Sequence, residues 1–155
     1  MDNIDILKKE LSAMDTQLSR LNSYYFSLNL LLCSESQKKL QEICQFCFNK
    51  KIAIYGAGIV GKVLFDLMLP HVPDVTVIDK SRGSIFDFNG QALCALDDLK
   101  DQSFDLIIVS LSSAYTAIAR DLKTLGMGEY ILVDDLILNT SFEGGKLSEN
   151  SGLLF

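Results

Sequence analysis

The residues that most clearly suggest a chemical function are three glycines that follow a short β-prone run, Ile52 to Tyr55. They form the pattern Gly56-x-Gly58-x-x-Gly61, and a helical pattern begins directly after them. In a dinucleotide-binding turn the first glycine makes the tight turn, the second lets the backbone approach a pyrophosphate, and the third lets helix and strand pack closely. The phosphates lie at the helix N-terminus, where unpaired N–H groups attract negative charge. The segment therefore predicts a nucleotide site formed by Gly56, Ala57, Gly58, Ile59, Val60 and Gly61.

An acidic residue at the end of the next apolar run supports this prediction. Asp79 lies 23 residues after Gly56 and follows the run Val75–Ile78, where a carboxylate accepts hydrogen bonds from a ribose diol. A carboxylate there favours NAD over NADP because it repels a 2′-phosphate, although the nearby Arg82 weakens that preference. The alternative is a turn whose glycines serve packing only.

The same glycines also match part of a phosphate-binding P-loop, since Lys62 follows Gly61. A P-loop needs Ser or Thr at the next position to hold magnesium, and this chain has Val63. The later apolar run 106–110 also lacks the aspartate that would hold the metal. An NTPase is therefore not expected.

Further polar groups follow the predicted strands, at the edge where ligands bind in open α/β sheets. The serines have an alternative role as ordinary helix N-caps, and the basic side chains have one as solvated surface groups. The candidates for binding phosphate, ribose or sugar in this group are Lys80, Arg82, Ser110, Ser112 and Ser113.

A catalytic acid or base is not evident beside these groups. His71, the single histidine, follows the predicted helix 59–69 at its far end, about 18 Å from the glycine turn at 1.5 Å per residue. None of the five tyrosines has a lysine four residues later, as short-chain dehydrogenases and epimerases require. No catalytic residue is predicted.

Composition narrows the class of protein. The chain has 155 residues, is 48% hydrophobic and carries a net charge of −6, which indicates a globular protein that does not bind nucleic acid. No apolar run approaches the length of a membrane span and no signal peptide is evident, so a cytoplasmic protein is expected.

The Cys44-x-x-Cys47 pair has no matching second pair for a zinc site, so no metal is expected and both thiols are predicted to be buried.

The first fifty residues carry a regular helical pattern. Nine apolar residues are spaced alternately three and four apart: Ile4, Leu7, Leu11, Met14, Leu18, Leu21, Tyr25, Leu28 and Leu32. This spacing indicates a coiled-coil seam and a homo-oligomer, or else a long helix that packs on its own domain. Glu10 and Asp15 would face each other in a parallel pair, which favours an antiparallel one. The run Ser34-Glu-Ser-Gln37 predicts a capping box that starts a second helix.

From Lys51 the pattern changes to alternating strands and helices, which is typical of a parallel α/β sheet. The expected strands are 52–55, 75–79, 91–94, 105–110 and 130–133, with helices at 59–69, 96–99, 114–125 and 135–138. Right-handed crossovers give a Rossmann-like five-stranded sheet of order 3-2-1-4-5. The predicted organisation is an N-terminal helical hairpin for oligomerisation (1–50), a nucleotide-binding domain (51–138) and a flexible C-terminal tail (139–155).

Residues 51–135 resemble small Rossmann-like domains of bacterial polysaccharide-biosynthesis enzymes. These are the N-terminal domains of sugar acetyltransferases and of nucleotide-sugar epimerase/dehydratases, and the C-terminal domain of sugar methyltransferases. The resemblance rests on the glycine turn, Val77-Ile-Asp79, Gly90-x-x-Leu93, Asp97 to Leu99, and Asp105 to Ser110. It implies that a UDP-sugar or similar nucleotide binds at Gly56, Gly58, Gly61 and Asp79. The catalytic portions of those enzymes have no counterpart here.

Three hypotheses follow from these observations. The first is a nucleotide- or nucleotide-sugar-binding module, oligomeric through its N-terminal helices, that acts with a separate catalytic protein in sugar metabolism. The second is an interaction or regulatory module that uses its coiled coil. The third is a small NAD-dependent oxidoreductase or epimerase whose acid–base group comes from a partner.

Overall fold

The computed structural model of the protein describes residues 3–79, 93–110, 115–124, 126, 130–138, 140–143 and 146–149. Two helices come first, and strands alternate with helices after them, so the chain is an α/β protein with N-terminal helices. The elements are α1 (Asn3–Leu32), α2 (Ser34–Cys47), β1 (Ile52–Tyr55), α3 (Ile59–Met68), β2 (Val75–Ile78), η1 (Leu96–Leu99), β3 (Leu106–Val109), α4 (Tyr115–Thr124), β4 (Tyr130–Leu132), α5 (Val133–Leu138), β5 (Thr140–Glu143) and β6 (Lys146–Glu149).

The central sheet has four parallel strands in the order β2-β1-β3-β4, with Ile52 of β1 between Val75 and Leu106. This order confirms the prediction for four of the five expected strands. The described residues form four strands in this sheet and not the five expected. Of the strand expected at 91–94, residues 91 and 92 lie outside the described residues, and Cys94 makes an isolated parallel bridge with Ile78. The chain turns into η1 two residues later, so no ladder continues beyond Cys94.

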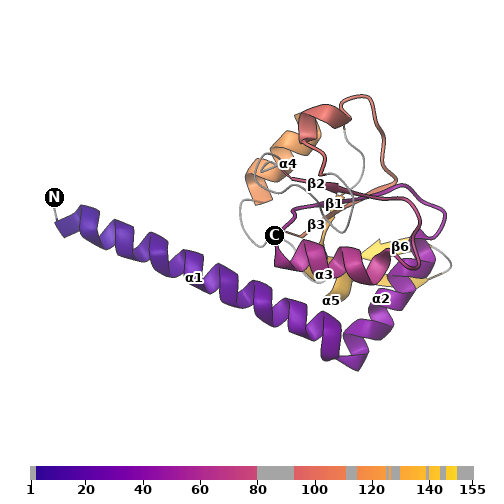
Figure 1. Ribbon diagram of the computed structural model, residues 1–155, viewed down its shortest axis with the longest axis horizontal. Coiled ribbons are helices and arrows are strands. Elements are labelled where there is room, and N and C mark those ends of the chain that lie inside the picture. The colour runs from indigo at the N-terminus through magenta and orange to yellow at the C-terminus, as the bar shows by residue number, and fades with distance from the viewer. Residues whose placement is uncertain are drawn as a thin grey trace.

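The sheet lies between two layers of helices (Figure 1). Side chains alternate along each strand, so Ile52 and Ile54 join a large core with α2, α3 and α5, whereas Ala53 and Tyr55 join a smaller one with α4. Both faces of β1 and β3 are buried along their whole length, as expected for parallel strands covered on both sides.

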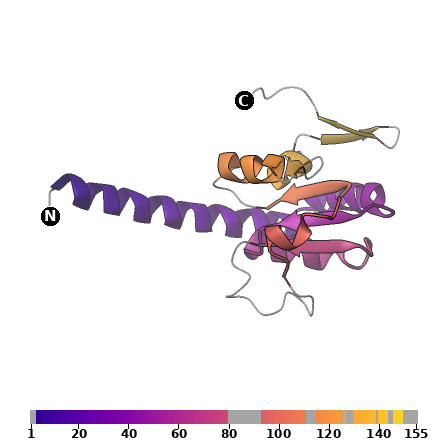
Figure 2. The same cartoon turned by 90° about the horizontal axis from the view of Figure 1, so that it is seen from above.

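The N-terminal helices contribute directly to the large core. Leu30 of α1 and Ile43 and Cys47 of α2 are completely buried there. The N-terminal part of α1 extends beyond the rest of the molecule in both views (Figure 2). Within the described part of the chain, no helix is long and apolar enough to cross a membrane.

The start of α2 differs from the predicted capping box. The N-cap is Cys33, in an extended conformation and without a side-chain cap, and Ser34 already lies inside the helix. The Gln37 side chain donates a hydrogen bond to the Leu31 carbonyl instead of reaching back to Ser34. The reason is the sharp turn between α1 and α2, which uses a single residue and moves the cap one position earlier.

The C-terminal residues that the structure describes form an antiparallel hairpin. β5 pairs with β6, with Thr140 opposite Glu149 and Glu143 opposite Lys146. This hairpin lies within the segment 139–155 for which a flexible tail was expected.

Candidate functional site

The polar ends of β1 and β3 meet at the point where the chain changes direction across the sheet. These two strands are neighbours, but the helix that follows β1 covers one face and the helix that follows β3 covers the other. In open α/β sheets ligands bind outside the carboxyl ends of the strands at this switch point. Gly56 follows β1 there, and Ser110 follows β3.

Two of the three glycines are required by the fold itself. Gly56 has a φ of 110°, a conformation that L side chains rarely adopt, and its N–H donates a 2.8 Å hydrogen bond to the Ile78 carbonyl. A Cβ added to Gly61 would collide with the Gly56 carbonyl oxygen and lie 2.8 Å from Ser110 Oγ. The tight turn and the close packing of helix on strand that the motif predicts are therefore both present.

Gly58 differs from the other two glycines. It is the exposed N-cap of α3, with φ −75° and ψ −168°, which any residue can adopt. A Cβ added there would meet no atom within 4 Å. Neither its conformation nor its packing within the described residues therefore requires a glycine. No described residue fills the space beside it at the N-terminus of α3, where phosphate groups bind in nucleotide sites.

Asp79 lies at the turn, as its position in the sequence predicts. Its Oδ2 atom accepts a 2.7 Å hydrogen bond from the Ala57 N–H, and its own N–H donates to the Cys94 carbonyl at 3.0 Å. The carboxylate thus ties the end of β2 to the turn after β1. The predicted contact between Asp79 and a ribose stays a prediction.

Ser110 also builds the turn. Its buried hydroxyl donates to the Gly56 carbonyl at 2.9 Å and to the Tyr55 carbonyl at 3.1 Å. The sequence predicted that this hydroxyl contacts a ligand, but its contact with the glycine turn was not predicted. The signal that would have revealed the contact is the adjacency of β1 and β3, which places the residue after one strand beside the residue after the other.

Four of the predicted ligand contacts, Lys80, Arg82, Ser112 and Ser113, lie outside the described residues. Ile59 and Val60 occupy the first turn of α3, where Val60 is buried in the core and Ile59 is exposed. Lys62 is exposed in the same turn. Lys62 was not among the predicted ligand contacts, although its side chain places a positive charge near the N-terminus of α3.

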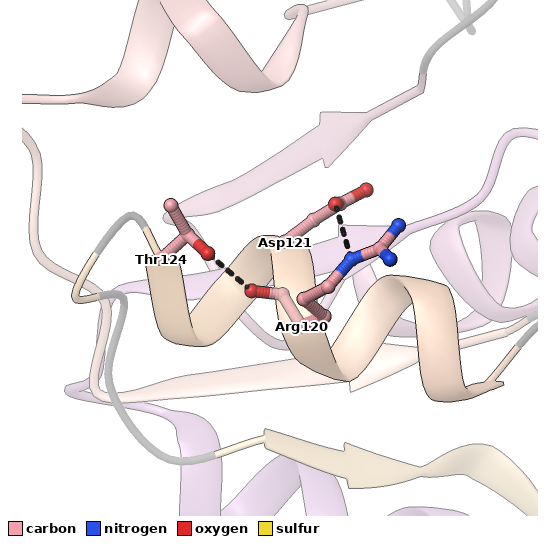
Figure 3. A network of polar contacts seen from close by, with 3 residues as sticks. All are labelled: Arg120, Asp121 and Thr124. Carbon is pink, nitrogen blue, oxygen red and sulfur yellow. Dashed lines mark hydrogen bonds and ion pairs between the residues drawn. The ribbon is translucent and has the colours of Figure 1, made fainter.

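Arg120 is the described basic residue in the first two turns of α4, and its contacts do not lie at the switch point of the sheet. Arg120 lies in the second turn of the helix, with its Nε 4.0 Å from Asp121 Oδ1, and its carbonyl accepts a 2.8 Å bond from the Thr124 hydroxyl (Figure 3). The Arg120 side chain is largely exposed. These contacts run along the helix toward its C-terminal end and therefore away from the glycine turn.

The histidine and the paired cysteines lie elsewhere. His71 lines a pocket between α2 and the end of α3, together with Gln41, Cys44 and Phe48. Burial raises the pKa of the Cys44 thiol to about 11 and that of Cys47 to about 12. Both thiols are therefore protonated at neutral pH, and their predicted burial is confirmed. Among the described residues, no group of three or more His, Cys, Asp or Glu side chains is placed to hold a metal ion.

Fold and site together define a parallel α/β domain with a glycine-rich turn at its switch point. Residues 48–133, more than half of the chain, match the model of the C2185-like family, N-terminal domain. The chain therefore belongs to the C2185-like family. That match does not connect it with the polysaccharide enzymes that it resembles, and no curated protein matches the chain.

One solved structure that matches part of the chain is a chorismate mutase/shikimate 5-dehydrogenase fusion protein from Clostridium acetobutylicum. The identity is 13% and the TM-score is 0.43, and the match covers 62% of this chain and 46% of that one. The chain thus corresponds to less than half of that protein.

Proposed function

We propose that this protein binds a nucleotide, either NAD or a nucleotide sugar such as a UDP-sugar, at the turn from Gly56 to Gly61. It does so in sugar or polysaccharide metabolism, and a separate protein supplies the catalytic groups. The observation that carries the proposal is the surroundings of Gly58, because an added Cβ there would meet no described atom within 4 Å and its backbone conformation suits any residue. A ligand that approaches the backbone explains this glycine.

The surroundings of Gly58 suit a pyrophosphate. The first N–H groups of α3 have no partners within the helix, and they carry the positive end of the helix dipole. The exposed Lys62 adds a positive charge one turn into the helix. A nucleotide whose pyrophosphate lies at Gly58 extends its ribose toward the end of β2, where Asp79 is located.

A second candidate function rests on the hydrogen bonds of the turn. Asp79 accepts from Ala57 and Ser110 donates to Gly56, so two predicted ligand contacts already stabilise the turn from within. This arrangement favours an interaction module in which the turn is structural and α1 recruits a partner. The two functions differ in whether a nucleotide binds.

Titration calorimetry of the full chain against NAD, NADP, UDP-glucose and CoA separates them. We expect binding of at least one, and we expect Gly58→Ala to weaken it by about tenfold or more, since the added methyl group occupies the path of the pyrophosphate. The melting temperature of Gly58→Ala serves as the control, and it should stay within a few degrees of the wild-type value. A folded protein that binds none of the four compounds contradicts the proposal, and equal affinity of wild type and variant contradicts the placement of the ligand.

A further inference from the structure

The apolar stripe of α1 is exposed along its whole length. We define the α1 stripe as the nine residues from Ile4 to Leu32 that are spaced alternately three and four apart. Their side chains are between 54% and 77% exposed, with Leu28 at the lower limit and Leu32 at the upper. Contiguous apolar surface of this extent is rare on monomeric proteins and marks an interaction site.

The stripe is not the face by which α1 contacts its own domain. α1 packs against α3 and α2, and the residues buried in this contact are Ser27 and Leu30, with Phe26 packed beside them. In the heptad that assigns Leu11 to position a and Met14 to position d, these three residues occupy positions b, c and f. The intramolecular contact and the stripe therefore lie on different sides of the helix, so the alternative of a helix that uses its stripe to pack on its own domain does not fit the described residues.

The stripe is most clearly without an intramolecular contact in the N-terminal half of α1, among the described residues. From Asn3 to Leu18 every described residue is exposed, and Figure 1 shows this part of the helix extending away from the sheet and the other helices. A helix in water gains most of its stability from packing its apolar face. This segment has an apolar face on which the described part of the chain places nothing.

We propose that a second copy of this chain covers the first six residues of the α1 stripe, from Ile4 to Leu21, as an antiparallel coiled coil. The register places the two-fold axis between Leu11 and Met14, so that each Leu11 packs on the partner copy's Met14. The outer layers then pair Leu7 with the partner copy's Leu18, and Ile4 with the partner copy's Leu21. This overlap uses residues 4–21, and the first half-buried residues of α1, Ser19 and Ser23, lie close to its end, so the two domains lie at opposite ends of the coil.

The charged residues beside the stripe favour this antiparallel register over the other arrangements that the apolar spacing permits. In the proposed register the e positions bring Lys8 opposite the partner copy's Asp15, twice by symmetry, and the g positions bring together Glu10 and Gln17. A parallel pair in register would instead place Glu10 opposite the partner copy's Asp15. An antiparallel pair shifted by one heptad toward the domain would place the two Asp15 side chains together. Opposite charges at these flanking positions set partner orientation in coiled coils.

The mass of the full chain, measured by sedimentation equilibrium, tests the proposal, and a charge-swap series tests the register. We expect a dimer, and we expect Leu11→Asp to convert it to a monomer that still unfolds cooperatively in urea. Lys8→Asp and Asp15→Lys should each weaken dimerisation by roughly fivefold to tenfold, because each creates two like-charge pairs. The double variant Lys8→Asp with Asp15→Lys should restore the wild-type dissociation constant.

Lys9→Asp is the matched control, since it makes the same charge change at the outward f position and should leave the dissociation constant unchanged. Asp15→Lys also separates the two orientations. It weakens the antiparallel pair but strengthens a parallel one, where the introduced positive charge would face Glu10. Stronger association of Asp15→Lys, a wild-type monomer at the highest measurable concentration, or an assembly larger than a dimer each overturns the proposal.

Discussion

The Asp79 carboxylate accepts a 2.7 Å hydrogen bond from the Ala57 N–H and thereby joins the end of β2 to the glycine turn after β1. Parallel strands have no short connection at this edge, because the chain must cross over through α3 between them. The hydrogen bond therefore holds the glycine turn against the end of β2, beyond the last backbone hydrogen bond between the two strands. It gives Asp79 a function in the folded chain whether or not a nucleotide is bound.

Replacing Asp79 should reveal that function in the free energy of unfolding. Asp79→Ala leaves the Ala57 N–H without its charged acceptor, and we expect a loss of about 1.5–3 kcal/mol. Asp79→Asn keeps an oxygen acceptor in a neutral group, so it should lose about half as much. Urea denaturation of the full chain at pH 7 measures both, and equal stability of all three proteins would show that the bond contributes nothing.

Gly61 should be the least replaceable residue of the turn. The added methyl group of Gly61→Ala would collide with the Gly56 carbonyl oxygen, and we expect a loss of about 3 kcal/mol or more because backbone rather than a flexible side chain must move. Gly58→Ala is the matched control, with a change of less than about 1 kcal/mol, since an N-cap tolerates alanine at moderate cost. Similar stability losses for the two variants would contradict the geometry of the turn.

Ser110 should act through the turn rather than through a ligand. Ser110→Ala removes the hydroxyl that donates to Gly56 and Tyr55, and we expect a loss of about 1 kcal/mol in thermal or urea unfolding. The same substitution should not rescue Gly61→Ala, because the closest contact of that methyl group is the Gly56 carbonyl. Recovery of wild-type stability in the double variant would mean that the hydroxyl, and not the backbone, excludes a side chain at Gly61.

Periodicity predicted most of the fold because each element carries its own pattern. The run Ile52–Tyr55, the glycines after it and the helix from Ile59 are local signals, and the structure places all three as expected. The strand expected at 91–94 is a single bridge at Cys94 among the described residues, since the chain turns into η1 at Leu96, and the apolar pattern does not encode where that turn begins. The bonds of Asp79 and Ser110 to the turn depend on which strands become neighbours, so single-strand patterns identified the residues but not their partners.

Cysteine reactivity should follow the surroundings of each thiol. The backbone N–H groups of Ser36 and Glu35 at the start of α2 favour the thiolate and lower the pKa of the partly exposed Cys33 thiol, which keeps more of it as thiolate when the pH falls. Burial raises the pKa of Cys44 to about 11 and of Cys47 to about 12. In iodoacetamide labelling between pH 7 and 8, followed by peptide mass spectrometry, Cys33 should therefore react well before the other two.

Unfolding in urea is the control for this order, since it should make the three thiols react at similar rates. If Cys44 or Cys47 were modified as fast as Cys33 in the native protein, the packing of α2 against the sheet would be wrong.

Truncating a side chain should affect stability much more in α2 than in the N-terminal half of α1. Ile43 of α2 is completely buried beside Leu30 in the large core, whereas Leu11 of α1 is 62% exposed. We expect Ile43→Ala to lower the free energy of unfolding by about 2–5 kcal/mol because it leaves a cavity. Leu11→Ala should change it by less than about 0.5 kcal/mol at protein concentrations low enough for a monomer.

Urea titrations at two protein concentrations separate stability from association, because only the latter depends on concentration. A large, concentration-independent loss in Leu11→Ala would show that the stripe packs within its own chain, and the case for a second copy on α1 would then fail.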